Sequence, residues 1–418
     1  MNPIEYKNNQ LHIEKINIQE LSNSNQTPFY CYSEESIINQ YDGLYSAFDM
    51  DIKIFYAMKA NSNLSIIKLL LNKGSGIDVV SGGEIERAIR AGAKGKDIIY
   101  SGIGKTDEEL NYAIESKVHC INVESQSELI RINDISKSLG VKQNIAIRIN
   151  PDVDAKTHIK ITTGMAENKF GIEYDYTESI YKIAADLKNI NIAGISVHIG
   201  SQITSLKPFK KAYTIMYDII KNLRSIGHKI DHVDLGGGLG VSYTTEENIP
   251  TFKEYANLIQ SIFGNADIKV YIEPGRLLVA NSGLLITKVT DVKTTTQKTF
   301  IIVDAAMNDF IRPTLYGSYH EILPIKNNLG TSNKVYDIVG PICETGDYFA
   351  KNRKMNSVKI GSIIAIKSVG AYGSVQSSNY NSRPQIAEIL VKDDKYEIIR
   401  ERVEVKDLIK QEKIATWL

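Results

Sequence analysis

The sequence predicts a (β/α)8 barrel joined to an all-β domain, and three observations lead to this fold class. First, 418 residues exceed the size of one average domain, so two domains are the natural expectation. Second, short apolar runs alternate with amphipathic stretches of helical period, a pattern typical of a parallel sheet. Third, after about residue 283 the strand-like runs follow one another without intervening helices.

The barrel is expected because the chain contains eight apolar runs of strand length, the number that a (β/α)8 fold requires. These runs are Ile52–Met58, Gly76–Ser81, Asp97–Ser101, Cys120–Glu124, Asn144–Asn150, Ile192–Ile199, His232–Leu235 and Lys269–Glu273. Helical stretches such as Glu84–Ala91 and Phe209–Ile220 lie between them. We expect the barrel to occupy residues 28–282. A doubly wound open sheet is the competing interpretation.

The second domain is expected to be a β-sandwich or β-barrel formed by residues 1–27 and 283–418. Its strand-like runs are Leu284–Lys293, Thr299–Asp304, Lys334–Val339, Ser362–Val369, Ile386–Lys392 and Tyr396–Arg402. Asp393-Asp394 separates the last two runs and predicts a hairpin. About the first 25 residues do not follow the alternation of strand and helix, so we expect them to pack against this domain.

The composition argues against several classes of function. Lys and Arg together number 49, as do Asp and Glu, so no net charge attracts nucleic acid or an anionic membrane. No apolar run reaches the roughly 18–20 residues of a membrane span, and Met1–Lys7 lacks the apolar core of a signal peptide. The three cysteines form no CxxC pair or metal-binding pattern and suit a reducing cytosol. We therefore expect a cytoplasmic protein without a bound metal.

Lys59 is the first candidate catalytic residue. It follows the apolar run Ile52–Tyr56, which is typical of a buried strand. A lysine at the end of such a strand loses water around its ammonium, which lowers its pKa, and the neutral amine can then attack a carbonyl. A Schiff base with pyridoxal phosphate is the chemistry that this suggests, although most lysines at strand ends are solvated.

Further unusual residues fall at the C-terminal ends of the predicted strands, where barrel enzymes carry their chemistry. Besides Lys59 they are Asp78 with Ser81–Glu84, His198–Ser201, Gly236–Gly238 and Glu273–Arg276. The glycine run lets backbone N–H groups approach an anion, and barrels often bind phosphate after strands seven and eight. A tight turn alone would also explain the glycines.

Two of these side chains suit a pyridine ring. Glu273 ends a buried strand, where a carboxylate needs a donor. It is either one half of a structural ion pair or the partner of a protonated pyridine nitrogen, which would make the cofactor a strong electron sink. His198 is either a core histidine with satisfied hydrogen bonds or a flat imidazole that stacks on the pyridine.

The second domain offers three more candidates. Cys343 stands beside two acids in Cys343–Asp347 and could protonate a carbanion. Arg312 offers a guanidinium fork suited to a substrate carboxylate, a solvated surface arginine being the alternative. Tyr372 lies in the tight turn Ala371–Gly373 and either reaches a phosphate or is a half-buried tyrosine with a satisfied hydroxyl.

Together these residues resemble the fold-type III, pyridoxal-phosphate-dependent decarboxylases, over nearly the whole chain. The motifs that carry the resemblance are Tyr56–Asn61, Asp78–Glu84, Asn150–Ala155 with Thr157-His158, Lys169–Ile172, His198–Gln202, Gly236–Gly238, Glu273–Arg276, Arg312–Tyr316, Gly340–Asp347 and Tyr380–Pro384. Their number and their order argue against chance. The family implies a barrel, a β domain, and a homodimer whose active sites lie at the subunit interface.

The resemblance also implies a role for each matching position. Lys59 would hold pyridoxal 5′-phosphate as a Schiff base. The other cofactor contacts would be Asp78, His198, Ser201, Gly238, Glu273, Pro274, Gly275, Arg276 and Tyr372. The substrate contacts would be Arg276, Arg312, Tyr316, Glu344 and Tyr372. Cys343 and Glu344 would come from the neighbouring subunit, with Cys343 as the proton donor.

The reaction expected from the resemblance is decarboxylation of meso-2,6-diaminopimelate to L-lysine and CO2, the last step of lysine biosynthesis. The second carboxylate of this substrate needs a cation, which Arg276 or Arg312 could supply. The pair Cys343-Glu344 also favours diaminopimelate over ornithine as the substrate, because ornithine decarboxylases typically have Cys-Asp at this place. An ornithine- or arginine-type decarboxylase, an alanine-racemase-like enzyme of the same fold and a non-catalytic cofactor-binding regulator are the alternatives.

The chain departs from the family pattern at two positions. The family usually has Ser where Thr345 stands, and commonly Arg where Gln385 stands, and neither change touches an expected catalytic role. The polar segment Asp152–Lys169 is the candidate for a lid that closes the site.

Overall fold

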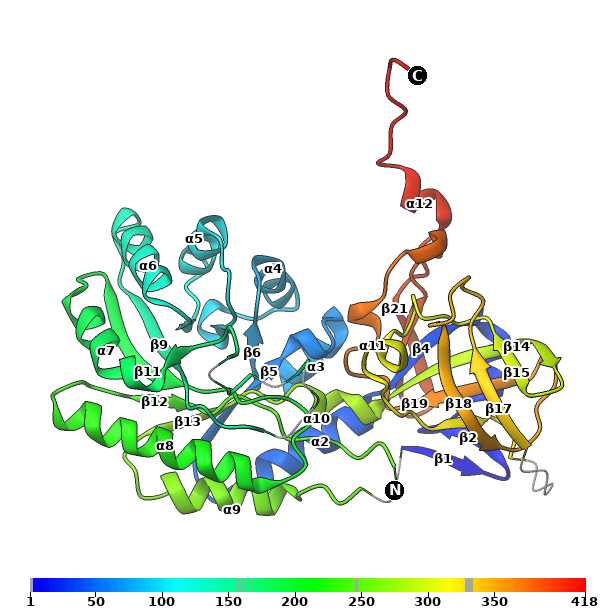
Figure 1. Ribbon diagram of the computed structural model, residues 1–418, viewed down its shortest axis with the longest axis horizontal. Helices are drawn as coiled ribbons and strands as arrows, with labels where there is room; N and C mark the ends of the chain where they lie inside the picture. Colours follow the sequence, from blue (N-terminus) through cyan, green and yellow to red (C-terminus); the bar gives the residue numbers. More distant parts are fainter. Residues whose placement is uncertain are drawn as a thin grey trace. The chain divides into compact units, whose positions relative to one another are not determined.

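The computed structural model describes residues 3–155, 158, 160–161, 163–165, 167–244, 247–327 and 334–418. The chain divides into two compact units, whose elements are labelled in Figure 1. The first, here called the barrel unit, comprises Gln40–Ser242 and Asn248–Leu278. The second, here called the β unit, comprises Met1–Asn39, Tyr243–Glu247 and Val279–Leu418. Each unit is described by itself.

A closed barrel of eight parallel strands is the framework of the barrel unit. Its strands are β5 (Ile52–Ala57), β6 (Gly76–Val79), β7 (Ile98–Tyr100), β8 (Cys120–Val123), β9 (Gln143–Asn150), β11 (Ile190–Ser196), β12 (His232–Asp234) and β13 (Lys269–Ile272). Strand β9 pairs with both β8 and β11, and β13 pairs with β5, so these eight strands close into a ring, to which the two-residue β10 (Ile172–Glu173) is added beside the end of β9. The expected barrel strands are therefore confirmed, and the open doubly wound sheet is wrong.

Helices surround the strands of this unit, as Figure 1 shows. They are α3 (Leu64–Asn72), α4 (Gly82–Arg90), α5 (Asp107–Glu115), α6 (Gln126–Ser138), α7 (Thr177–Asp186), α8 (Leu206–Ser225) and α9 (Phe252–Phe263). Several begin at a hydroxyl that caps the first turn: Thr106 and Thr251 form capping boxes with the Glu three residues later. Each of these helices follows a barrel strand in the chain, so the loops that lead from strand to helix lie at one end of the barrel and bring their polar residues there.

The β unit is built on a sheet with the strand order β18-β17-β15-β14-β4-β20-β21, with β19 pairing with β14 and β16. The strands are β4 (Phe29–Ser33), β14 (Gly283–Thr294), β15 (Thr299–Val303), β16 (Ile322–Pro324), β17 (Lys334–Val339), β18 (Tyr348–Met355), β19 (Ile363–Lys367), β20 (Ala387–Lys392) and β21 (Lys395–Arg400). The predicted hairpin between β20 and β21 is confirmed, and Asp393 makes its turn with a φ of 54°.

The N-terminal residues contribute β1 (Ile4–Lys7), β2 (Gln10–Ile13), β3 (Ile16–Asn17) and α1 (Ile18–Ser24) to the β unit. Leu11, Ile13 and Ile18 are buried in one apolar core with Leu284 and Ile389. This packing places Leu11, Ile13 and Ile18 in the β unit.

Several strands of the β unit were absent from the sequence-based prediction, among them the short β16 and strands β1 to β3 as well as β18 and β4. Strand β18 reads as polar because Lys351, Arg353 and Lys354 lie on it, and its pairing with β17 is interrupted by register shifts. Strand β4 pairs with β14 and β20, so it belongs to this sheet although residue 28 was the expected start of the barrel. The barrel unit accordingly begins at Gln40, within α2 (Glu34–Ser46). Among the described residues, no helix combines the length and the apolar character that crossing a membrane requires.

Candidate active site

Lys59 lies directly beyond β5, in a single 3₁₀ turn of Met58–Ala60. The backbone N–H of Ala57 donates to the carbonyl oxygen of Pro274, which ties the end of β5 to the loop after β13. The ammonium of Lys59 donates to Asp78 Oδ2 on β6 over 3.0 Å. The Asp78 carboxylate is fully buried, and within the described part of the chain its second oxygen, Oδ1, has no hydrogen-bond partner.

A cavity of about 350 Å³ opens at this end of the barrel. That volume is within the ordinary range for small-molecule sites. Its lining is Lys59, Val80, Ser101, Gly102, Ile103, Asn122, Arg148, Thr163, Phe170, Ser196, Val197, His198, Asp234 and Glu273. A larger hollow of about 810 Å³ lies at the opposite end of the strands, around Arg224, Asp231 and Lys269. It is open to solvent and contains none of the predicted site residues, so the smaller cavity is the candidate site.

Two carboxyl groups share the deepest part of this cavity. Asp234 ends β12 and Glu273 follows β13, both are buried, and their carboxyl groups hydrogen bond to each other. Burial raises the pKa of Glu273 well above its ordinary value, and the charges of Asp234 and Asp78 raise it further. Burial also raises the pKa of Asp234.

His198 faces the same cavity as a neutral ring. The N–H of Gly237 donates to its Nδ1 over 3.2 Å, so Nδ1 is the acceptor and the ring proton lies on Nε2. Burial lowers the pKa of His198 well below its ordinary value, with further contributions from the positive charges of Arg148 and Lys59. An uncharged imidazole can lie against a cationic ring without electrostatic repulsion.

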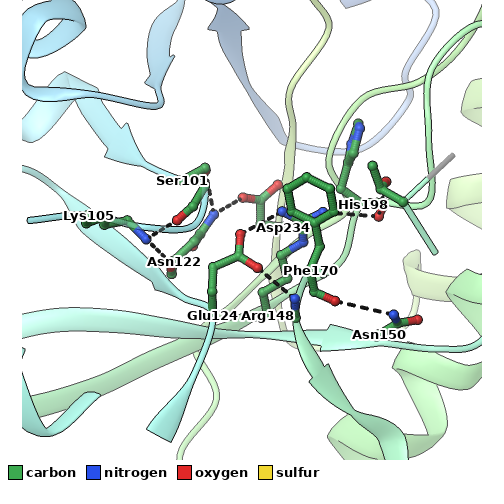
Figure 2. A network of polar contacts seen from close by, with 12 residues as sticks. Ser101, Lys105, Asn122, Glu124, Arg148, Asn150, Phe170, His198 and Asp234 are labelled. Carbon is green, nitrogen blue, oxygen red and sulfur yellow. Dashed lines mark hydrogen bonds and ion pairs between the residues drawn. The ribbon is translucent and has the colours of Figure 1, made fainter. Parts of the chain in front are cut away.

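A buried ion pair supports the wall beside His198, as Figure 2 shows. Arg148 Nη1 donates to Glu124 Oε1 over 2.7 Å, while Arg148 Nη2 donates to the carbonyl oxygen of His198 over 3.4 Å. The other Glu124 oxygen accepts from the N–H of Gly171, and the guanidinium of Arg148 lies 4.9 Å from the ring centre of Phe170. The pair therefore joins the ends of β8 and β9 to two loops that line the cavity.

The glycine run after β12 is packed against backbone. A Cβ on Gly237 would lie 2.2 Å from the carbonyl oxygen of Glu273, and one on Gly238 would lie 2.4 Å from that of Gly200. Gly236 and Gly238 also have positive φ angles of 65° and 110°. Beside this loop, Arg276 Nη2 donates to Ser201 Oγ over 3.1 Å. The sequence needs glycine here because loops from β11, β12 and β13 meet at close range.

The β unit orients Arg312 at the start of α11 (Arg312–Tyr316). The guanidinium donates to Tyr243 Oη over 3.3 Å and to His320 Nε2 over 3.5 Å. His320 Nδ1 lies 2.9 Å from the carbonyl oxygen of Lys367, so it carries the ring proton and leaves Nε2 as an acceptor. The guanidinium also lies 5.6 Å from the ring centre of Tyr316. Arg312 is buried, so the alternative of a solvated surface arginine is wrong.

The loop with Cys343 and Glu344 is anchored by Asp347. This buried carboxylate accepts from the N–H groups of Met307 and Ile342, each over 2.7 Å. Cys343 and Glu344 themselves are exposed. Glu344 hydrogen bonds to the hydroxyl of Tyr380, which raises the pKa of that tyrosine.

The remaining sequence-based candidates are placed as follows. Tyr372 is half-buried with a φ of 55°. Gln385 donates to Ser377 Oγ over 3.1 Å, away from any predicted catalytic group. Pro274 and Gly275 lie in the loop after β13. In the candidate lid, Lys156, Thr157, Ile159, Thr162 and Ala166 lie outside the described residues.

The structure thus brings Lys59, His198 and Glu273 to one cavity, with Asp78 beside Lys59. Sequence reasoning missed other members of its lining or support: Ser101, Asn122, Glu124, Arg148 and Asp234. A signal was present, because each is a polar residue within or at the end of an apolar run of strand length. The candidates Arg312, Tyr316, Cys343, Glu344 and Tyr372 belong to the β unit.

Comparison with known proteins gives consistent results. Residues 34–280 match the family model described as "Pyridoxal-dependent decarboxylase, pyridoxal binding domain". The chain is 44% identical to the diaminopimelate decarboxylase of Vibrio cholerae, covering 96% of this chain and 95% of that protein. It is 43% identical to that of Aquifex aeolicus, covering 96% and 94%.

Solved structures of similar proteins agree with the fold. The diaminopimelate decarboxylase of Helicobacter pylori, complexed with L-lysine, superposes with a TM-score of 0.91 at 42% identity, covering 94% of this chain and 98% of that one. The enzyme of M. jannaschii, in co-complex with L-lysine, gives a TM-score of 0.95 at 37% identity, covering 100% and 99%.

Proposed function

The chain belongs to the pyridoxal-dependent decarboxylases, and from this membership we propose that it converts meso-2,6-diaminopimelate to L-lysine and CO2. The cofactor is pyridoxal 5′-phosphate. The observation that carries the proposal is the convergence of Lys59, His198 and Glu273 on one cavity at the C-terminal end of the barrel. Curated relatives of nearly equal length bear the name of this decarboxylase, which supports the substrate.

The residues of the cavity fit the cofactor. The cavity is large enough for a substituted pyridine. Two polar atoms of its lining, Asn122 Oδ1 and Ser196 Oγ, are buried and have no hydrogen-bond partner in the described part of the chain. Unsatisfied buried polar atoms are costly, so they suit a site where a polar ligand binds.

When bound, the cofactor supplies an aldehyde for amine exchange and an electron sink for the electrons left by the departing CO2. We propose that Lys59 is its covalent anchor, with Asp78 orienting the ammonium through their 3.0 Å contact. His198 would contact the ring as a neutral imidazole, and Glu273 would hold a proton at the ring nitrogen. Ser201, Gly238, Gly275, Arg276 and Tyr372 would surround the phosphate, and Pro274 would be a further cofactor contact.

Substrate recognition is proposed mainly for residues of the β unit, with Arg276 of the barrel unit as a further contact. Diaminopimelate differs from ornithine and arginine by a second carboxylate, which a guanidinium binds well. Arg312 is held by Tyr243 and His320, so its fork is pre-oriented for such a group. Arg276, Tyr316 and Tyr372 would add contacts, and Glu344 would bind the distal ammonium.

We also propose that Cys343 protonates the carbon after CO2 leaves, and that Cys343 and Glu344 act in the active site of a second copy of the chain. Both side chains are exposed on a loop fixed by Asp347, which supports a role outside their own unit. The protein would then be a homodimer with shared sites, and it would work in the cytoplasm.

The first test is CO2 release from the purified protein with added pyridoxal phosphate, using meso-diaminopimelate, L-ornithine and L-arginine. Release from diaminopimelate alone is expected. CO2 release from ornithine or arginine would agree with the proposed decarboxylation but would contradict diaminopimelate as the substrate. Inversion of the substrate's stereocentre without CO2 release would indicate a racemase. No reaction with any of the three amino acids would favour a non-catalytic regulator.

Lys59→Ala tests the anchor. It should abolish turnover, because no other group replaces the amine. Lys53→Ala is the matched control, because Lys53 lies on β5, the strand that Lys59 follows, but its ammonium donates to the carbonyl oxygen of Gly74, which is not part of the cavity lining. Near-normal turnover of Lys59→Ala would contradict the assignment.

Mixing tests the shared site. Lys59→Ala and Cys343→Ala should each be inactive alone. If both sites of a dimer combine residues of two copies, random reassociation restores one intact site in half of the dimers, so about a quarter of the wild-type activity returns. No recovery, with dimers confirmed by light scattering, would place each site within one chain.

A further inference from the structure

The carboxyl pair of Asp234 and Glu273 is the most unusual buried feature of the barrel that the roles above leave unexplained. Asp234 is 1% exposed and Glu273 is 7% exposed, and their side chains hydrogen bond to each other. Two ionised carboxylates cannot form such a bond, because neither has a hydrogen to donate. Two negative charges buried side by side also repel each other, so the pair is most stable with a proton on one of the two groups.

The surrounding donors indicate which group is ionised. Asn122 Nδ2 donates to Asp234 Oδ2 over 2.9 Å, and the N–H of Gly236 donates to Asp234 Oδ1 over 3.0 Å. Among the described residues, the hydroxyl of Ser101 donates to Glu273 Oε1 over a longer distance of 3.3 Å. Donors stabilise a carboxylate, so Asp234 carries the charge and Glu273 carries the proton.

Other charged and titratable groups act on the pair from the neighbouring elements. The Asp78 carboxylate raises the proton affinity of both members, while the Lys59 ammonium lowers that of Glu273. Glu84 lies beyond Asp78, and burial raises its pKa to about 7. The remaining neighbours, which are uncharged at neutral pH, are Cys120, Tyr213, Tyr255 and Tyr271.

We propose that Asp234 is a positioning residue that acts through Glu273: the two carboxyl groups hold one shared proton, and Asp234 keeps that proton available for the pyridine nitrogen of the cofactor. This inference rests on the proposed function, in which Glu273 meets that nitrogen. If Glu273 gave this proton to the pyridine nitrogen, its O–H bond would break and an N–H bond would form, so the number of protons would be unchanged. The negative charge of Asp234 then disfavours loss of the proton to solvent.

The test is the protonation of the pyridine nitrogen in the full-length protein loaded with ¹⁵N-labelled pyridoxal phosphate, followed by ¹⁵N NMR between pH 6 and 9. In the wild type the nitrogen should stay protonated throughout. In Asp234→Asn the charge is removed and the new amide can donate to Glu273, so the pKa of the nitrogen should fall by about 1–3 units. Deprotonation should then become visible within this pH range.

Two further variants complete the design. Asn122→Ala removes a donor from ionised Asp234 and so raises the pKa of Asp234, which then keeps the shared proton for more of the time. The pKa of the nitrogen should therefore fall by a smaller amount than in Asp234→Asn, and this variant keeps the proposal testable if Asp234→Asn does not fold. Asp231→Asn is the matched control, because this exposed aspartate precedes the same strand and pairs with Lys229. It should leave the nitrogen unchanged.

The outcomes separate this inference from the proposed function. If Asp234→Asn, or Asn122→Ala in its place, titrates like the wild type and Asp231→Asn, Asp234 is merely a structural cap of Gly236 and the inference fails. If the wild type does not bind the labelled cofactor, or binds it equally well after Lys59→Ala without a covalent link, the proposed function fails instead.

Discussion

The buried pair of Glu124 and Arg148 should stabilise the barrel and also position the cavity wall, and the two roles can be separated. The two side chains are 3% and 10% exposed, with their charged atoms 2.7 Å apart. Glu124→Gln removes one charge and leaves the guanidinium of Arg148 buried without its partner. The double variant Glu124→Leu with Arg148→Met removes both charges and retains apolar volume.

The magnitude follows from the geometry. At an effective dielectric constant of about 20, two unit charges 2.7 Å apart attract each other by about 6 kcal/mol before desolvation is counted. Removing one member of such a buried pair costs about 3–5 kcal/mol. For a unit of this size, about 2–4 °C of melting temperature correspond to each kcal/mol, so Glu124→Gln should lower the melting temperature by about 6–20 °C. The double variant should recover most of this loss.

Activity should not recover with stability. The double variant still lacks the donor to the His198 carbonyl, the acceptor for the Gly171 N–H and the cation beside Phe170. The assay is kcat/KM with diaminopimelate, alongside the melting temperature. Glu128→Gln is the matched control, because the Lys105–Glu128 pair is equally buried and lies outside the cavity lining. It should lower the melting temperature and leave the kcat of the folded protein near normal. Full recovery of kcat/KM by the double variant would refute the positioning role.

Three further predictions concern other parts of the molecule. Burial raises the pKa of Glu84 from 4.5 to about 7, so the stability that protonated Glu84 contributes is present below pH 4.5 and is lost as the pH rises through about 7. In Glu84→Gln the melting temperature should therefore depend less on pH between pH 5 and 8. If the melting temperature of this variant falls with pH as steeply as that of the wild type, Glu84 does not cause the dependence. Gly237→Ala should abolish cofactor binding, measured by absorbance, because the new Cβ would lie 2.2 Å from the Glu273 carbonyl oxygen. The control Gly83→Ala should bind the cofactor normally, because its Cβ would lie 3.9 Å from the nearest atom. Equal binding by both variants would contradict this steric argument. Asp347→Asn should weaken the hydrogen bonds that anchor the Cys343 loop by about 1–3 kcal/mol, so kcat should fall while the absorbance of the bound cofactor stays normal. If the variant also loses the cofactor, the effect of the substitution is not confined to that loop.

The fold was largely predictable from local pattern. Alternation of apolar runs with amphipathic stretches is imposed by the burial of parallel strands under helices, so the barrel strands could be read directly. Strand β18 could not, because its exposed side carries Lys351 and Arg353 and its pairing with β17 is irregular. Strand β4 could not be assigned to the β unit either, since pairing with β14 and β20 joins segments far apart in the chain.

The sequence by itself determined the barrel class, the position of Lys59 at a strand end and the position of the glycine run after Asp234. These features follow from the pattern of neighbouring residues, and in a parallel barrel all strands end on the same side. Only the tertiary structure decided the electrostatics of the cavity. The pairing of Asp234 with Glu273, the neutral ring of His198 and the Glu124–Arg148 support all arise between residues on different strands. Burial and the distance between charges set the protonation of such groups, and both exist only once the barrel has closed.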